Sequence, residues 1–310
     1  MAASKWGRTL LVANPLAHSG EGAEAADALD SALAQDRSLV SSLDVIHTHK
    51  PGDGAALSVR MARYDTVLVL GGDGVMHDVA NGVMALPDED RPRLGLVPFG
   101  TGNDYARTLG IPFEDVLGSL EALRGGTDRM LDLGKANDVY FVETLSFGYD
   151  AAIALDTSRR RQEGTRQRNA GLFVTSGMRI FSDNHEGWPY EVLFDGAEGL
   201  SGNDQVFAVQ IGPTYGGGFK ICPKASPYDG LLDICYNAIT PKPATALVLF
   251  GLARGGLHVG AKTIRIRQTR RFTIWFESEP PAQADGERIS GTTFEVSCVP
   301  EALRVIVPAS

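Results

Sequence analysis

The feature that most limits how this chain can fold is a glycine cluster between a buried strand and a helix. An apolar run over residues 66–70 predicts the strand, Gly71-Gly72-Asp73-Gly74 follows it, and helical spacing continues from about Val75 to Met84. Backbone amides at the start of a helix attract phosphate, because they are unpaired and lie at the positive end of the helix dipole. A lone cluster of this kind is more often a tight turn without a ligand, so other loops must decide its meaning.

Two more loops are predicted at the same edge of the sheet. Pro98-Phe99-Gly100-Thr101-Gly102-Asn103-Asp104 follows a predicted strand over 94–97, and the loop 14–22 follows another over 9–13. Apolar strands that alternate with helices indicate a parallel sheet covered on both faces, and such sheets bind ligands at the carboxyl ends of their strands. Three such loops predict a phosphate-bearing ligand. Asp73 would repel it unless its carboxylate binds magnesium or its water, or accepts a hydrogen bond from ribose or backbone.

Missing motifs and composition exclude several classes of protein. The chain has no Gly-x-x-x-x-Gly-Lys-Ser/Thr loop and no Gly-x-Gly-x-x-Gly followed by a ribose-binding acid, which argues against a P-loop enzyme and a dehydrogenase. Its formal net charge of -9 argues against a partner that is nucleic acid. No uncharged apolar run reaches the roughly 18 residues of a transmembrane segment. Three cysteines without metal-ligand spacing predict reduced thiols in a cytoplasmic protein.

The second half of the chain changes to an antiparallel pattern. After a basic, helical stretch over 159–181, β-rich runs alternate with turn dipeptides such as Asp195-Gly196 and Asp285-Gly286. The predicted strands cover residues 190–194, 205–211, 231–236, 263–267, 272–276, 294–299 and 303–307. This pattern is typical of a β-sandwich.

We therefore predict two domains. Residues 1–130 form an α/β nucleotide-binding domain with a Rossmann-like parallel sheet, and residues 131–310 form a mainly antiparallel β-sandwich domain for the substrate. The last strand, residues 300–310, is free to return to the first domain. The active site is expected in the cleft between the domains.

Taken in order, these motifs resemble the diacylglycerol kinase catalytic-domain family. The resemblance covers nearly the whole chain and is carried by Asn14-Pro15, Gly71-Gly72-Asp73-Gly74, Asn81-Gly82, Pro98-x-Gly-Thr-x-Asn-Asp104 and Asp285-Gly286-Glu287. That family includes bacterial diacylglycerol kinases and sphingosine and ceramide kinases, and its nucleotide domain is similar to those of NAD kinase and phosphofructokinase. The resemblance implies that ATP, with Mg²⁺, phosphorylates a lipid hydroxyl, with diacylglycerol, which yields phosphatidic acid, as the first expectation.

The resemblance also implies roles for individual residues. Asp285 would be the general base, with Glu287 in support and Arg107 supplying positive charge. Asp73 and Asp104 would hold the catalytic magnesium and its water. The nucleotide would be bound by Asn14, Ser19, Thr48, Gly71, Gly72, Asp73, Gly74, Gly100, Thr101 and Asn103.

Some positions depart from the family pattern. Val75 stands where the family usually has Thr, and Asp78 where it usually has Glu; we expect altered nucleotide affinity rather than lost activity. Some members hold a structural magnesium with an Asp three residues before the Asp-Gly that matches Asp229-Gly230, and that position is Ser226 here. Asp229 is thus either a ligand of a second, incomplete metal site or part of a plain turn. Asp285-Gly286 alone would equally fit an ordinary hairpin turn.

A basic segment bears on how a lipid would be reached. Residues 156–180 hold six arginines against Asp156 and Glu163, followed by apolar side chains at Leu172 to Val174 and Met178. Basic and apolar residues together fit contact with an anionic membrane surface, here through Arg159, Arg160 and Arg161. A solvated basic face on a packed helix is an equal alternative, and pairing with ATP phosphates is another.

Three functions remain open at this point. The first is a cytoplasmic, peripherally membrane-associated lipid kinase in phospholipid biosynthesis, acting on diacylglycerol or on another lipid alcohol such as a sphingoid base, a polyprenol or phosphatidylglycerol. The second is a kinase of a soluble small molecule, and the third is a catalytically silent nucleotide- or lipid-binding regulator, supported only by Val75 and Ser226. The sequence leaves a homodimer open.

Overall fold

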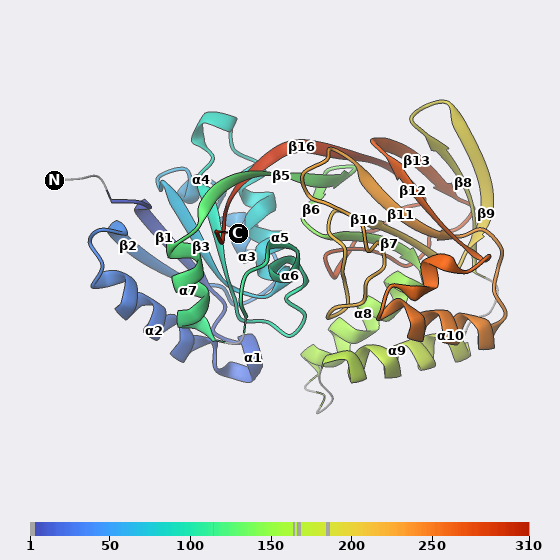
Figure 1. The fold of residues 1–310 in the computed structure, drawn as a ribbon, viewed down its shortest axis with the longest axis horizontal. Helices are drawn as coiled ribbons and strands as arrows, with labels where there is room; N and C mark the ends of the chain where they lie inside the picture. Colours follow the sequence, from blue (N-terminus) through green and yellow to red (C-terminus); the bar gives the residue numbers. More distant parts are fainter. Residues whose placement is uncertain (1–3, 114, 164, 166–168, 184–186, 310) are drawn as a thin grey trace. The chain divides into compact units, whose positions relative to one another are not determined.

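The computed structural model describes residues 4–113, 115–163, 165, 169–183 and 187–309. By contacts between Cα atoms the chain divides into two compact units, the first formed by Met1–Leu131 with Glu301–Ser310 and the second by Asp132–Pro300. Each unit has its own helices, and the strand β16 contributes residues to both units (Figure 1). In the described part of the chain, every helix is too short or too polar to cross a membrane.

The first unit contains a parallel sheet in the order β2-β1-β3-β4-β16. Its strands are β1 (Gly7–Ala13), β2 (Val40–His47), β3 (Thr66–Gly71), β4 (Arg93–Pro98) and the end of β16 (Thr293–Val307). Every residue of β3 is buried, which confirms the prediction of a strand covered on both faces. After β1 the chain forms β2, which lies on one side of β1 in the sheet. After β3 it forms β4, which lies further along the sheet in the opposite direction. The carboxyl ends of β1 and β3 therefore form the switch point of the sheet, where open α/β sheets bind ligands.

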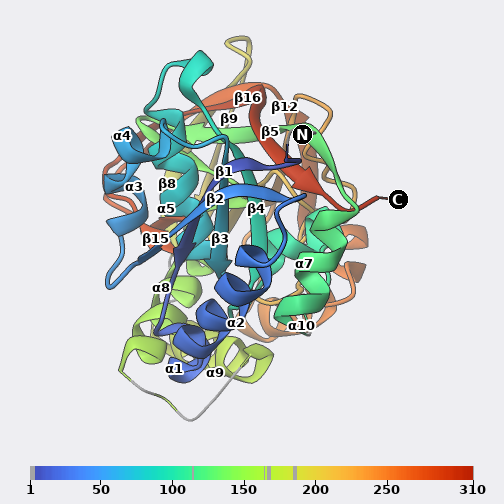
Figure 2. The same cartoon turned by 90° about the vertical axis from the view of Figure 1, so that its left-hand side faces the viewer.

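Helices cover both faces of this sheet. They are α1 (Ala17–Gly20), α2 (Gly22–Ala34), α3 (Asp53–Ala56), α4 (Ser58–Met61), α5 (Asp73–Met84), the 3-10 helix η1 (Asp88–Asp90), α6 (Asp104–Leu109) and α7 (Val116–Arg124). In Figure 2, α2 and α7 lie on one side of β1 to β4, and α3, α4 and α5 lie on the other. Helical spacing over 54–63 predicts a single helix, and this prediction is wrong, because the chain breaks at Leu57 where α3 packs closely on α5. A Cβ on Gly54 would lie 2.8 Å from the Cβ of Asp78.

The second unit contains two antiparallel sheets. One has the order β12-β11-β10-β7-β14-β15, and the other joins the first residues of β16 to β13, β8 and β9. The strands are β5 (Thr127–Ala136, which begins in the first unit), β6 (Val139–Phe141), β7 (Thr144–Gly148), β8 (Trp188–Phe194), β9 (Glu198–Asp204), β10 (Val206–Gln210), β11 (Leu232–Asn237), β12 (Ile264–Thr269), β13 (Arg271–Phe276), β14 (Ala282–Ala284) and β15 (Glu287–Arg288). An aromatic core lies between the two sheets. In it Phe147 packs against Phe294 at 4.9 Å between ring centroids and against Phe207 at 6.0 Å. The predicted fold class, α/β followed by a β-sandwich, is confirmed.

Helices form a third layer in the second unit. They are α8 (Tyr149–Gln162), α9 (Asn169–Asp183), α10 (Pro243–Ala253) and the 3-10 helix η2 (Leu257–Gly260). Figure 1 shows α8, α9 and α10 on one side of β7, β10 and β11. Because side chains alternate along a strand, Phe207 faces the aromatic core while Ala208 contacts a second core under these helices, which includes Ile153 and Ala253.

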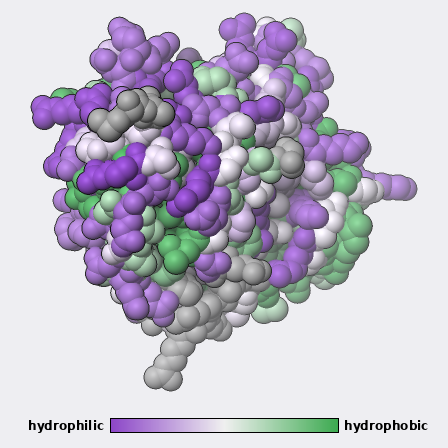
Figure 3. Space-filling model, turned by 60° about the vertical axis from the view of Figure 1, so that its left-hand side comes forward, coloured by the Kyte–Doolittle hydropathy of each residue, from purple (hydrophilic) through white to green (hydrophobic). Residues whose placement is uncertain are grey.

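The observed strands differ from the predicted ones in three ways. The strands β5, β6, β7, β14 and β15 were not predicted. The runs 294–299 and 303–307 are one strand, β16, which continues through Pro300 with Glu301 at φ 49°. The polar strand β9 was not predicted, since it carries few apolar residues and pairs with β8 along the sheet edge. On the face drawn in Figure 3, hydrophilic residues predominate and hydrophobic ones gather in patches.

Candidate functional site

The structure brings the predicted loops of the first unit together at the carboxyl ends of its strands. The amide of Asn14 donates to the carbonyl of Leu70 at 3.0 Å, and the amide of Thr48 donates to the carbonyl of Ala13 at 2.8 Å. The amide of Phe99 donates to the carbonyl of Gly71 at 2.8 Å. Each loop is thus tied to its neighbour at the point where its strand ends, around the switch point of the sheet.

Two glycines in these loops are required by contact between the loops themselves. A Cβ on Gly100 would lie 2.5 Å from the Cα of Gly72, and a Cβ on Gly72 would lie 3.1 Å from the Cα of Gly100. Asn103 clamps the second loop: its Oδ1 accepts from the amide of Gly100 and its Nδ2 donates to the carbonyl of Gly100, both at 3.0 Å. A side chain at Gly72 would therefore crowd the backbone at Gly100.

Asp73 lies at the start of α5 but is held by the start of α6. Its carboxylate accepts hydrogen bonds from the amides of Asp104 at 3.2 Å and Tyr105 at 3.1 Å. A hydrogen bond from the backbone was one of the ways in which, by the sequence analysis, Asp73 could lie in a phosphate-binding loop. The positive end of α6 offsets the charge of Asp73, so the acid can lie beside the amides of α5.

Carboxylate oxygens of two acids converge beside Gly102. A Cβ built on Gly102 would lie 2.9 Å from Oδ2 of Asp73 and 3.3 Å from Oδ2 of Asp104. Asp104 is only 5% exposed, and Nε of Arg107 lies 4.0 Å from its Oδ1. The guanidinium of Arg107 also lies 4.4 Å from the ring centre of Phe113. The absence of a side chain at Gly102 leaves the space in which these oxygens meet.

This pair of carboxylates fits a magnesium ion. Mg²⁺ prefers oxygen ligands and is usually held by one or two carboxylates together with water and substrate phosphates. Within the described residues, no group of three or more His, Cys, Asp or Glu side chains is arranged to hold a metal. A magnesium ion held by Asp73 and Asp104 would therefore need further ligands, such as water or a phosphate.

The other predicted nucleotide contacts have local structural roles as well. Oδ1 of Asn14 accepts from the amide of Leu16 at 3.0 Å and shapes the turn into α1. The side chain of Thr48 is buried. The side chain of Val75 packs against Gly71: a Cβ built on Gly71 would lie 2.9 Å from Cγ2 of Val75. Gly74 and Thr101 are half-buried. The side chain of Ser19 lies outside the described part of the chain.

Asp285 belongs to the second unit and occupies a two-residue hairpin between β14 and β15. Asp285 and Gly286 have φ of 49° and 94°, the left-handed values that such a turn requires. The carboxylate is 8% exposed and accepts three backbone hydrogen bonds, at 2.8 Å from Val142 and at 3.0 Å from both Glu143 and Thr144. Both of its oxygens are thus fixed in position by amides from another part of the chain.

Glu287 pairs across the same hairpin and is half-buried on β15, opposite Ala284. The dipeptide predicted the turn, but no signal in the sequence pointed to the amides that hold Asp285, because they lie more than 140 residues earlier.

Asp229 lies in a turn beside an acid that sequence reasoning missed. Oδ1 of Asp229 accepts from the amide of Leu231 at 3.0 Å, and Oδ2 of Asp132 accepts from the amide of Gly230 at 2.7 Å. Burial and the nearby charge of Asp132 raise the pKa of Asp229 above its ordinary value. Each carboxylate binds an amide of this turn, an arrangement that a turn explains without a second metal.

The basic segment on α8 and α9 is organised around Asp156. Arg159, Arg160 and Arg179 lie 2.6, 3.9 and 3.6 Å from its carboxylate oxygens. Burial opposes the charged form, but hydrogen bonds from Arg159 and Ser176 and the charges of Arg159 and Arg179 hold the pKa of Asp156 below its ordinary value. Three of the arginines predicted to face a membrane or a phosphate are therefore ion-paired within the unit. Arg166, Arg168 and the side chain of Arg161 lie outside the described residues.

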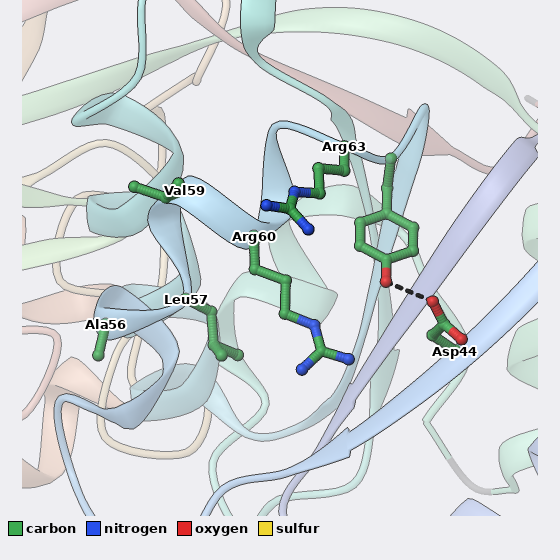
Figure 4. A pocket seen from close by; sticks show the side chains of 7 residues that line it. Asp44, Ala56, Leu57, Val59, Arg60 and Arg63 are labelled. Carbon is green, nitrogen blue, oxygen red and sulfur yellow. Dashed lines mark hydrogen bonds between the residues drawn. The ribbon is translucent and has the colours of Figure 1, made fainter.

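A hollow of about 580 Å³ lies elsewhere on the first unit (Figure 4). Its lining includes Leu57, Val59, Arg60 and Arg63, and at its edge the hydroxyl of Tyr64 donates to the carboxylate of Asp44. None of the predicted site residues lines it, so it is separate from the glycine loops.

Comparison with known proteins matches both parts of the chain to one family. Residues 8–136 match the diacylglycerol kinase catalytic domain, and residues 143–307 match the YegS C-terminal NAD kinase beta sandwich-like domain. A diacylglycerol kinase of Mycobacterium tuberculosis is 31% identical over 97% of this chain and 96% of its own. A protein of Yersinia enterocolitica named "Probable lipid kinase YegS-like" is 30% identical over 83% and 81%.

Solved structures share the fold. A diacylglycerol kinase of Bacillus anthracis has a TM-score of 0.76 at 23% identity, with 98% of each chain covered. Yeast NADH kinase has a TM-score of 0.53 at 11% identity, with 99% of this chain and 84% of the kinase covered. The full-length relative from Mycobacterium tuberculosis and the two matching domains show that this chain belongs to the diacylglycerol kinase family of lipid kinases.

Proposed function

We propose that this protein is an ATP- and magnesium-dependent kinase that phosphorylates the hydroxyl of diacylglycerol to give phosphatidic acid. The observation that carries the proposal is the junction of the glycine loops in the first unit, where oxygens of Asp73 and Asp104 converge beside Gly102 in a chain of this family. Phosphoryl transfer depends mainly on positioning and on charge neutralisation, and this junction supplies elements for both.

In this proposal the loops bind the phosphates of ATP. The amides at the start of α5, next to Gly72, lie at the positive end of the helix dipole and would attract the phosphates, and the clamp by Asn103 keeps the neighbouring loop in place. Asp73 and Asp104 would hold magnesium, which when bound neutralises charge on the phosphates. Arg107, beside Asp104, would add positive charge near the same phosphates.

Asp285 is proposed to accept the proton of the lipid hydroxyl. As the hydroxyl oxygen forms a bond to the γ-phosphorus of ATP, its proton passes to the carboxylate of Asp285. The bond between the γ-phosphorus and the oxygen that bridges it to the β-phosphate breaks at the same time and releases ADP. A positioned acid–base group typically contributes about 10² to 10⁴ in rate. The three amides on Asp285 support this role, because they restrict the carboxylate to one orientation. Glu287, in the same hairpin, is proposed to support the base.

The first test is a transfer assay with purified protein, labelled ATP, magnesium and mixed vesicles. The vesicles contain diacylglycerol, a sphingoid base, a polyprenol or phosphatidylglycerol, and soluble alcohols are assayed in parallel. Label in phosphatidic acid is the expected result. Label in another lipid would correct the substrate, and label only in a soluble acceptor would overturn the lipid proposal. ATP binding without transfer to any acceptor would favour a silent regulator.

The second test concerns the junction itself. Gly102→Ala adds a methyl group beside the oxygens of Asp73 and Asp104, so magnesium-dependent nucleotide binding should weaken at least about tenfold. Gly125→Ala is the matched control, because its Cβ would meet only ordinary contacts at 3.8 Å. Calorimetric titration with ATP, with and without magnesium, measures the difference. Equal affinity in both variants would remove the junction from the nucleotide site.

A further inference from the structure

An apolar helix lies at the surface of the second unit with one face covered and another exposed. On its covered side, Ala246 and Ala253 are 9% and 3% exposed, and the ring of Phe250 stacks on Phe219 at 5.1 Å between centroids. The exposed side continues into η2 and the residues before the helix. We call the following residues the α10 face: Ile239 (61% exposed), Leu247 (43%), Val248 (61%), Leu252 (37%), Leu257 (70%) and Val259 (39%).

The exposed apolar side chains of the α10 face are close together in the chain and are not single residues spread over the surface. Among the described residues, 14 large hydrophobic side chains are exposed, and six of them lie within residues 239–259. Single exposed apolar residues are normal in proteins, whereas a group on one element marks a contact with a partner or a membrane. A helix that is apolar around most of its circumference is usually covered on every side. The exposed side of α10 is therefore expected to become buried when a partner or a membrane binds to it.

The charges along this part of the chain favour an anionic partner. Residues 234–276 contain no Asp or Glu, although the chain has 38 acidic residues and a net charge of -9. The same residues include seven basic ones: Lys242, Arg254, Lys262, Arg265, Arg267, Arg270 and Arg271. Lys242 precedes α10, and Arg254 and Lys262 follow it and η2; all three are exposed. Exposed basic residues thus stand before α10, between α10 and η2, and after η2, among the uncharged residues of the α10 face.

We propose that the α10 face is the surface by which this protein inserts into an anionic lipid bilayer. The inference rests on the proposed function, since a kinase of a water-insoluble lipid must reach the membrane that contains it. Apolar side chains would enter the boundary between headgroups and acyl chains, while the flanking lysines and arginines contact anionic headgroups. A second copy of this chain would bring the same basic residues against each other, so charge complementarity favours the bilayer.

This proposal moves the membrane contact away from Arg159 to Arg161, where the sequence first placed it. Arg159 and Arg160 pair with Asp156 in the second unit. In contrast, α10 presents uncharged side chains that are already exposed and cost little to transfer into the interface.

The binding test uses vesicles made from equal parts of phosphatidylglycerol and phosphatidylcholine. Replacing Val248 and Leu257 together with Glu should weaken cosedimentation with these vesicles at least about tenfold, because two charges would have to enter the interface. Both positions are largely exposed, so the fold should tolerate the change, and circular dichroism checks it. Val59→Glu, at a residue 75% exposed in the first unit, is the matched control and should bind as the parent does. Equal binding by the double variant would overturn the proposal.

Charge reversal tests the electrostatic part separately. Lys242→Glu and Lys262→Glu should each weaken binding by at least about fivefold at low salt, which is the effect of about 1 kcal/mol per basic residue near an anionic surface. The loss should shrink as salt screens the interaction. Lys50→Glu in the first unit serves as the control. Binding that ignores both lysines, or binding to pure phosphatidylcholine of equal strength, would contradict an anionic partner.

A substrate comparison separates this inference from the proposed function. On diacylglycerol in vesicles, the Val248 and Leu257 double variant should lose activity together with binding, but on a short-chain diacylglycerol dispersed in water it should keep the parent's turnover. Turnover of both substrates by the double variant would reject the α10 face and leave the kinase function intact. Vesicle binding by the parent without turnover of either would reject the function and leave the inference intact. Self-association of the parent that the double variant abolishes, without vesicle binding, would replace the bilayer with a second copy.

Discussion

Two turns in the second unit share a dipeptide and a backbone conformation but differ in what their acids contact. Asp195-Gly196 lies between β8 and β9, and Asp285-Gly286 lies between β14 and β15. The φ angles are 48° and 74° in the first turn and 49° and 94° in the second. Both aspartates also accept backbone hydrogen bonds, so local structure alone does not distinguish them.

The difference lies in burial and in the origin of the donors. Asp195 is exposed, and its carboxylate accepts from Thr269 Oγ1 at 2.7 Å and from the amides of Arg270 and Arg271 at 3.3 and 3.2 Å. These three donors lie at the turn from β12 to β13, which links the two sheets. Asp285 is buried, and its donors lie just before and at the start of β7, the strand that pairs with β14 in the same sheet. An Asp-Gly pair thus predicts a turn, whereas its surroundings decide whether the acid closes a surface loop or is buried and held by backbone amides.

The largest difference between the two turns is expected when each aspartate is replaced separately by the neutral asparagine. We expect Asp285→Asn to lower kcat by about 10² to 10⁴ with little change in the KM for ATP, because an amide cannot accept the hydroxyl proton. Asp195→Asn should leave kcat unchanged. Steady-state kinetics on diacylglycerol, with the melting temperature of each variant, provide the measurement. Equal kcat for Asp285→Asn and the parent would assign Asp285 a purely structural role, as would a loss of kcat fully explained by unfolding.

A second, smaller effect is expected from the glycines of the two turns. Alanine at Gly196 or Gly286 would meet no atom within 4 Å but would have to adopt a left-handed backbone, which costs about 1 to 2 kcal/mol. Both variants should therefore lose similar stability in urea titrations. Only Gly286→Ala should also lower kcat, because a shift of the hairpin moves the carboxylate of Asp285. If Gly196→Ala lowered kcat equally, the loss would reflect stability rather than position.

The free energy of unfolding should depend on pH differently in the parent protein and in the Asp195→Asn variant. A hydrogen bond from Thr269, opposed by desolvation and aided by backbone amides, lowers the pKa of Asp195 from its ordinary 3.8. A lowered pKa in the folded state stabilises the protein above the unfolded pKa, and this contribution disappears as pH falls through the folded value. Asp195→Asn should therefore be less stable than the parent at pH 7 and approach it near pH 2. A stability difference that is independent of pH would contradict the assigned charge.

The smallest expected effect is on the hydrogen bond that Thr269 donates to Asp195. Thr269→Val keeps the shape of the side chain but removes this donor, which should cost about 0.5 to 1.5 kcal/mol or less at an exposed acceptor. Turnover should not change. Chemical denaturation at neutral pH measures the difference, and a change in kcat would show that the Asp195 turn is coupled to the chemistry after all.

Local patterns were sufficient for much of the fold. Residues 66–84 formed the predicted strand, glycine loop and helix, since each of these depends on neighbours in the chain. Periodicity also found β8, β10, β11 and β13, whose alternating residues face the aromatic core. It did not find β5, β6, β7, β14 and β15, nor the polar strand β9. It also failed for the helix expected over 54–63, which is broken by packing on α5. These elements depend on a partner strand or helix rather than on their own sequence.

The sequence by itself determined which loops end the parallel strands, which residues in them carry charge and which dipeptides turn the chain. Only the tertiary structure decided what those residues contact. Gly72 and Gly100 are glycines because two loops touch, and Asp73 is held by amides 31 and 32 residues further on. Asp285 is held by amides more than 140 residues away. Hydrogen bonds between such distant groups exist only once the sheets have assembled, so no local pattern can encode them.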